Sequence, residues 1–128
     1  MYTQKPYSNK YKDIRQTYNG VNYDSKLEAS RAYELDMLVK AKQIKGYERQ
    51  YKIQLYYYDA KGRQYNTKTW KVDFRVENLD GTFTLEEVKG VELPDFKFKR
   101  ELVENVWLVD NPDHNLVVLK QTNIRRRY

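Results

Sequence analysis

Residues 70–90 carry the pattern that most constrains what this chain can fold into. From residue 70 to residue 77, apolar and charged side chains alternate strictly: Trp70, Val72, Phe74 and Val76 against Lys71, Asp73, Arg75 and Glu77. Residues 78–81, which end in a glycine, separate this stretch from a second one at residues 82–90. Period-two alternation beside a glycine-containing turn predicts a β-hairpin.

Three charged residues of this hairpin need an explanation, because Asp and Glu are poor strand formers. They are Asp73 in the first strand and Glu87 and Lys89 in the second. Side chains two positions apart on a strand share a face, so Glu87 and Lys89 are neighbours. Glu86 alternates to the opposite face, and we expect it to be dispensable.

The length of the hairpin loop decides whether Asp73 joins Glu87. A two-residue loop sets Asp73 opposite Val88, whereas a three-residue loop at residues 79–81 sets it opposite Glu87. Three-residue hairpin loops favour glycine at their last, left-handed position, which Gly81 occupies. The sequence therefore predicts that the two carboxylates face each other.

Facing side chains on one sheet surface have Cβ atoms about 5 Å apart. Two carboxylates at that separation repel each other, and one keeps a proton unless a cation lies between them. Oxygen ligands with open water positions suit Mg2+. The expected ligands are Asp73, Glu87 and the Val88 carbonyl, with Lys89 placed to stabilise phosphate charge or orient a water. Since 33% of the chain is charged, an ordinary solvated hairpin face also fits these residues.

Residues 26–42 carry apolar side chains at spacings of three and four, which predicts an amphipathic helix. Residues 24–25 (Asp-Ser) provide its cap. Glu28 stands three residues after Ser25, where it also fits a capping box whose carboxylate reaches back to the cap backbone.

The order of these motifs resembles the PD-(D/E)XK nuclease superfamily, in particular small phage-encoded endonuclease-like proteins, Holliday-junction resolvases and transposon-end nucleases. The resemblance covers roughly residues 19–105, and its motifs here are Tyr23 to Ala29, Asp73, Glu87-Val88-Lys89-Gly90 and Phe98-Lys99-Arg100. Val72 stands where the family usually has a proline before the aspartate. In that family a helix glutamate adds a further acidic group to the metal site, and this glutamate corresponds to Glu28.

The resemblance implies an α/β fold with a restriction-endonuclease-like core, in which helices flank a central mixed sheet in the order α-β-β-β-α-β. It implies an enzyme, an Mg2+- or Mn2+-dependent endonuclease that hydrolyses DNA phosphodiester bonds in phage recombination or junction processing. The catalytic residues would be Asp73, Glu87, Lys89 and Glu28, with Glu28 binding a second ion or orienting the ligands of the first. Branched, nicked and duplex DNA all stay open as substrates, and a homodimer is common where both strands are cut.

Two further sets of residues lie beside these motifs, and the resemblance bears on Gln50 and Lys99 among them. Gln50, at the start of a strand expected over residues 49–58, matches a glutamine of the family and lies either near the site or on buried backbone groups. Pro94 suits the first turn of a helix over residues 95–105. The basic residues of that helix contact phosphate or solvent; they are Lys97, Lys99 and Arg100.

The formal net charge of +6 favours a polyanionic partner. We expect one domain over residues 20–121, a flexible basic arm at residues 1–19 and a basic tail at residues 122–128. The tail would strengthen nonspecific DNA binding through Arg125, Arg126 and Arg127. Without cysteine there is no thiolate metal site, and His114 is expected at the surface in a turn.

No apolar run approaches the roughly 18–20 residues of a membrane span, so we expect a soluble, cytoplasmic protein, in the host cell if phage-encoded. A catalytically silent DNA-binding module or phage accessory protein on the same fold is the alternative. Such a module gains nothing from Asp73 and Glu87 beside a phosphate. An RNA-directed nuclease also stays open.

Overall fold

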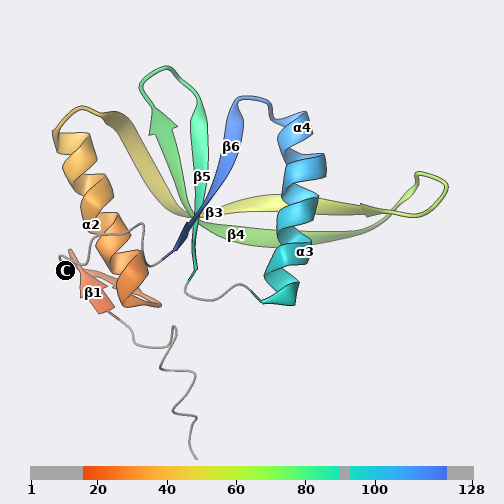
Figure 1. The fold of residues 1–128 in the computed structure, drawn as a ribbon, viewed down its shortest axis with the longest axis horizontal. Helices are drawn as coiled ribbons and strands as arrows, with labels where there is room; N and C mark the ends of the chain where they lie inside the picture. Colours follow the sequence, from red (N-terminus) through yellow and green to blue (C-terminus); the bar gives the residue numbers. More distant parts are fainter. Residues whose placement is uncertain (1–15, 90–92, 121–128) are drawn as a thin grey trace, which may run out of the picture.

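A mixed four-stranded sheet in the order β3-β4-β5-β6 forms the centre of the computed structural model, which describes residues 16–89 and 93–120 (Figure 1). The elements along the chain are β1 (Gln16–Tyr18), β2 (Val21–Tyr23), α2 (Lys26–Lys40), β3 (Ile44–Tyr58), β4 (Gln64–Asn78), β5 (Phe83–Lys89), α3 (Pro94–Leu102), the π-helical turn η1 (Val103–Trp107), α4 (Leu108–Asp110) and β6 (His114–Lys120). Strands β3, β4 and β5 pair antiparallel, and β6 pairs parallel to β5. The predicted α/β class and the order helix, three strands, helix, strand are confirmed.

Helices cover both faces of the sheet (Figure 1). One core cluster packs α2, through Leu27, Ala32 and Leu35, against Phe74 and other residues of β4 and β5. The other packs the segment α3–η1 against the sheet; its buried members are Ile53, Leu55, Trp70, Val72, Leu85, Phe96 and Val103. Among the helices of the described ranges, none is long and apolar enough to cross a bilayer.

The β4–β5 hairpin has the predicted register. Its pairs run from Glu77 opposite Phe83 to Phe74 opposite Glu86. The amide of Asn78 donates to the Thr82 carbonyl across the loop, at 2.8 Å. Gly81 has φ 88°, the left-handed conformation that glycine adopts without strain. The three-residue loop is therefore confirmed.

The N-terminal boundary and the element ends differ from the prediction. Residues 16–18, expected within a flexible arm, form β1 and pair with β2 around the Asn19–Gly20 turn. Helix α2 ends at Lys40 instead of residue 42, and β3 begins at Ile44, ahead of the expected residue 49. The basic tail with its three arginines, and residues 1–15 of the arm, lie outside the described residues.

Two predictions about the last strand are wrong. The continuous apolar run at residues 116–119 predicts a strand buried on both faces, but β6 is an edge strand and these residues are only half-buried. His114 was expected in a surface turn, yet its side chain is only 6% exposed. It begins β6 opposite Phe83, stacks on that ring at 4.8 Å and lies 4.9 Å from the Trp107 ring. The turn before it ends one residue earlier than expected, which places the imidazole inside the sheet packing.

Candidate functional site

The two strand carboxylates lie where β4 separates from β5. The β4–β5 ladder stops at the pair Phe74–Glu86, although β5 continues through Glu87 to Lys89 in its ladder with β6. Beyond that pair, backbone amides of each strand donate to a carboxylate of the other strand, in place of the ladder bonds. Glu87 Oε1 accepts from the Asp73 amide at 3.2 Å, and Asp73 Oδ2 accepts from the Val88 amide at 2.8 Å. The predicted meeting of the two carboxylates is confirmed, and we call this point the fork.

Strand β3 is irregular at the same level. Its ladder with β4 pairs Arg49 with Phe74 and Tyr51 with Val72, and skips Gln50, which stands opposite Asp73. Gln50 has φ 54°, a left-handed conformation that is strained for a residue other than glycine. Such strain is concentrated at functional sites, so the position of Gln50 beside the fork favours the first of its two predicted roles.

In both β3 and β4, side chains two residues apart pack on opposite faces of the sheet at the fork. Alternation would put Phe74 and Val72 on one face, yet Phe74 packs in the cluster of α2 and Val72 in the cluster of α3 and η1. Arg49 lies over the ring of Tyr23, whereas Tyr51 packs with the second cluster. The change from one core cluster to the other therefore falls at the level of the strands where the carboxylates lie.

Helix α2 brings a third carboxyl group to the fork. Ser25 Oγ accepts from the Glu28 amide at 3.1 Å, which confirms the predicted cap. Within the described part of the chain, the Glu28 carboxylate makes no return bond to the cap backbone. Burial, then repulsion from Asp73, Asp24 and Glu87, raises its pKa to about 8. Glu28 thus acts electrostatically with the strand carboxylates, and Glu28, Asp73 and Glu87 are called the carboxylate cluster below.

The other two members of the carboxylate cluster titrate abnormally as well. Burial raises the pKa of Asp73 to about 6, against the opposing effects of the Val88 amide and Lys89. Burial and repulsion from Asp73 raise the pKa of Glu87 to about 7, against the opposing effect of Lys89. Burial and mutual repulsion make several negative charges here costly, so without a cation the cluster keeps protons near neutral pH. Groups perturbed in this way cluster at functional sites.

Lys89 lies where the sequence predicts it. Its Nζ is 3.4 Å from Glu87 Oε2 and 4.6 Å from the centre of the Phe96 ring. Phe96 belongs to α3, so that helix holds the ammonium group against the carboxylate cluster. Lys97 and Lys99 follow on the same helix, the first exposed and the second half-buried. Arg100 is also half-buried, with its Nε 3.2 Å from Glu104.

Glu86 lies on the opposite face, as predicted, and it has a partner there. The residue is 5% exposed, and its carboxylate accepts two bonds from Arg31 of α2, at 2.8 Å to Nε and 2.6 Å to Nη2. Arg31 also pairs with Glu34 at 3.0 Å. This ion pair ties α2 to β5, a role that alternation along the strand does not reveal.

The chemistry of the carboxylate cluster fits a hard divalent cation, because all of its donors are oxygens and their raised pKa values fall when a cation approaches. Within residues 16–89 and 93–120, no three acidic or histidine side chains already stand in a metal-holding arrangement. Asp73 and Glu87 each give one oxygen to a backbone amide. Binding an ion would therefore require these side chains to rotate.

Two further charged residues at the site were not predicted. Asp24, expected only as part of the helix cap, raises the pKa of both Glu28 and Asp73. Arg49 lowers the pKa of the same two carboxyls. The only sign in the sequence that Arg49 lies at the site was its position next to Gln50. This position is informative only once the strand register is known.

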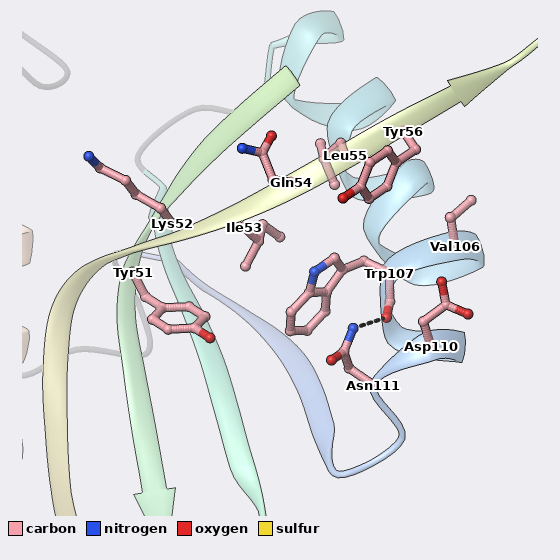
Figure 2. A pocket seen from close by; sticks show the side chains of 10 residues that line it. All are labelled: Tyr51, Lys52, Ile53, Gln54, Leu55, Tyr56, Val106, Trp107, Asp110 and Asn111. Carbon is pink, nitrogen blue, oxygen red and sulfur yellow. Dashed lines mark hydrogen bonds between the residues drawn. The ribbon is translucent and has the colours of Figure 1, made fainter. Parts of the chain in front are cut away.

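A pocket of about 310 Å3 lies away from the carboxylate cluster, between β3 and the segment η1–α4. Figure 2 shows Tyr51, Ile53 and Trp107 around it. The side-chain amide of Asn111 donates to the backbone carbonyl of Trp107 at 2.9 Å. None of the cluster residues lines this pocket. The candidate site at the fork is therefore separate from this pocket.

Comparison with known proteins places the chain in one family. Residues 8–121 match the family DUF1064, described as a protein of unknown function, and the chain belongs to it. No curated protein and no solved structure matches the chain.

Proposed function

We propose that this protein is a metal-dependent endonuclease of the PD-(D/E)XK type, with a restriction-endonuclease-like core, that hydrolyses DNA phosphodiester bonds. One observation carries the proposal. Three carboxyl groups with raised pKa values, Glu28, Asp73 and Glu87, act on one another where β4 leaves β5, with Lys89 beside them. An ordinary solvated hairpin face would not bury three carboxyl groups that repel one another.

In this proposal Asp73, Glu87 and the Val88 carbonyl hold Mg2+ or Mn2+. Glu28 holds a second ion or orients the ligands of the first. When bound, the ion supplies Lewis-acid activation of the phosphate. Binding exchanges the repulsion within the cluster for attraction to the cation, so the carboxyl groups lose the protons that burial otherwise keeps on them.

Lys89 acts on the reacting groups directly. Its ammonium group, held between Glu87 and the Phe96 ring, donates to a phosphate oxygen and offsets the charge that develops there. Its further N–H groups orient the attacking water. The strained backbone at Gln50 lies opposite Asp73 in the strand register, and in this proposal its side-chain amide orients a ligand or a water there.

Polyanionic DNA is the proposed partner because the chain carries a net charge of +6 and further basic residues lie on α3, the helix whose Phe96 contacts Lys89. Those residues, Lys97, Lys99 and Arg100, would contact phosphates flanking the one that is cut. A homodimer would serve cleavage of both strands. The cytoplasm, where DNA is accessible, is the proposed location.

The test is a cleavage assay on matched four-way junction, nicked and linear duplex DNA, each with Mg2+ and with EDTA. We compare the wild-type protein, Glu87→Gln and the control Glu77→Gln. Glu77 belongs to the neighbouring strand β4, but its side chain is 45% exposed and 4.0 Å from Lys45. We expect metal-dependent cleavage by the wild type and the control and none by Glu87→Gln. Equal cleavage by all three, or cleavage in EDTA, would contradict the proposal.

A catalytically silent DNA-binding module is the second candidate, and one observation favours it. Asp73 and Glu87 satisfy backbone amides that the interrupted ladder leaves open, which is a structural use of both carboxyl groups. In that case no substrate is cut, and Glu87→Gln binds DNA more tightly than the wild type because it removes a negative charge.

A further inference from the structure

Arg49 is a cation at the fork that takes part in none of the ion pairs described above. Arg49 lowers the pKa of Glu28 and of Asp73, so its charge acts on both. Within the described ranges, however, no carboxylate lies within ion-pair distance of its guanidinium group. Its Nε is buried and has no hydrogen-bond partner in that part of the chain. A buried donor without a partner costs free energy in the free protein. This cost indicates that Arg49 has a function in a bound state of the protein.

The position of Arg49 is fixed by the same strand irregularity that forms the fork. Arg49 pairs with Phe74, the neighbour of Asp73, and precedes the left-handed Gln50. Its guanidinium lies 4.8 Å from the centre of the Tyr23 ring, and Nη2 is 3.5 Å from the Asn22 carbonyl. Stacking on a buried tyrosine orients the planar group without neutralising it.

The carboxylate cluster alone would repel an anionic substrate, so a substrate phosphate needs cations on its other sides. Lys89 supplies one from β5. Arg49 supplies a second from β3, across the fork. A guanidinium group presents its N–H donors in a rigid plane that matches two oxygens of a phosphate.

We propose that Arg49 binds the non-bridging oxygens of the nucleic-acid phosphate that enters the fork, opposite Lys89. The inference rests on the proposed function and names a substrate-binding group of that site. Bound phosphate gives the guanidinium the anionic partner that the free protein does not provide.

The experiment measures binding of a labelled duplex DNA in EDTA, which separates binding from cleavage. Dissociation constants are determined at several salt concentrations for the wild type, Arg49→Gln, Arg49→Lys and the control Lys40→Gln. Lys40 is exposed and lies twelve residues beyond Glu28 on α2, about 18 Å along the helix. The control therefore removes the same charge far from the fork.

We expect Arg49→Gln to bind roughly ten- to a hundredfold more weakly than the wild type, as loss of a charge-assisted bond does. The slope of log affinity against log salt should fall by about 1. Lys40→Gln should keep the wild-type affinity and slope. Arg49→Lys should keep the slope but bind more weakly, because the ammonium group lacks the planar pair of donors.

The outcomes separate this inference from the proposed function. If the wild type binds and cleaves DNA while Arg49→Gln shows wild-type affinity and slope, the inference is wrong and the proposed function stands. If Arg49→Gln does not fold, as thermal unfolding would show, Arg49→Lys decides, and wild-type affinity in that variant overturns the inference. If the wild type neither binds nor cleaves DNA, the proposed function itself fails.

Discussion

Glu86 and Glu87 are neighbours in β5 and equally buried, each with 5% of its surface exposed, but their surroundings differ completely. Glu86 faces α2 and accepts two charge-assisted bonds from Arg31. Glu87 faces the fork, where Asp73 and Glu28 oppose its charge and Lys89 offsets it only in part. The comparison shows that burial alone does not mark a site. A buried charge with a complete partner holds the fold together, whereas one among like charges keeps a proton unless a cation binds beside it.

The largest expected difference between the two glutamates is in catalysis. Glu87→Gln should reduce Mg2+-dependent cleavage at least about a thousandfold, because several kcal/mol of transition-state stabilisation by the ion are lost with it. Glu86→Gln should keep most of the activity per folded molecule. Initial rates, corrected for the folded fraction by circular dichroism, give the comparison. Similar losses of cleavage activity in Glu87→Gln and Glu86→Gln would contradict the difference between the two glutamates.

In the free energy of unfolding, we expect the larger effect at Glu86 and the smaller one at Glu87. Arg31→Ala leaves the buried Glu86 carboxylate without its partner and should lower the free energy of unfolding by roughly 3 kcal/mol. Glu87→Gln removes a charge from a repulsive cluster and should leave the stability unchanged or raise it. Urea denaturation of both variants measures this. A destabilisation by Glu87→Gln as large as that by Arg31→Ala would mean that Glu87 is structural.

The pH dependence of stability tests the electrostatics of the carboxylate cluster. The pKa values of its three carboxyl groups in the folded protein lie above their ordinary values, at about 6, 7 and 8. The folded state therefore binds more protons than the unfolded state, and stability falls as the pH rises from about 4.5 to 8. Because a pKa difference of one between the folded and unfolded states corresponds to about 1.4 kcal/mol, we expect a loss of several kcal/mol in the metal-free wild type.

Glu87→Gln should flatten this pH profile, because one titrating group and its repulsion are gone. Thermal unfolding between pH 4.5 and 8 in EDTA measures both proteins. A wild-type stability that rises over this window would contradict the raised pKa values.

The smallest expected effect concerns the strained backbone. Gln50→Gly relieves a left-handed conformation and should stabilise the protein by about 1 kcal/mol. If the Gln50 amide orients groups at the fork, the same variant should also cleave DNA more slowly. The control Gln54→Gly changes an exposed position of the regular strand and should be destabilising. A destabilised Gln50→Gly would show that the conformation carries no strain.

Local chemistry in the sequence was sufficient to predict the site's central pair. Gly81 is suited to the left-handed position of a three-residue loop, and that loop alone sets Asp73 opposite Glu87. Ser25 likewise predicts the start of α2 through the bond it accepts from Glu28. Both signals span only a few residues, which is why alternation and capping rules find them.

What the sequence missed depends on packing between distant segments. The burial of His114 results from contacts with Phe83 and Trp107, which belong to different elements. The position of Arg49 near Glu28 and Asp73 depends on the irregularity of β3 at Gln50, and regular alternation gives no sign of it. The partner of Glu86 lies on another element, 55 residues earlier in the chain. None of these can be read from periodicity.

The most direct test of the central claim is Mn2+ binding at pH 7.5 by isothermal titration calorimetry in buffers of different ionisation enthalpy. If the carboxylate cluster holds the ion, the wild type binds Mn2+ and releases at least one proton, because the raised pKa values fall as the cation enters. Glu87→Gln should lose this binding, and Glu77→Gln should keep it. A wild type that binds no Mn2+, or binds it equally well without Glu87, would contradict the account.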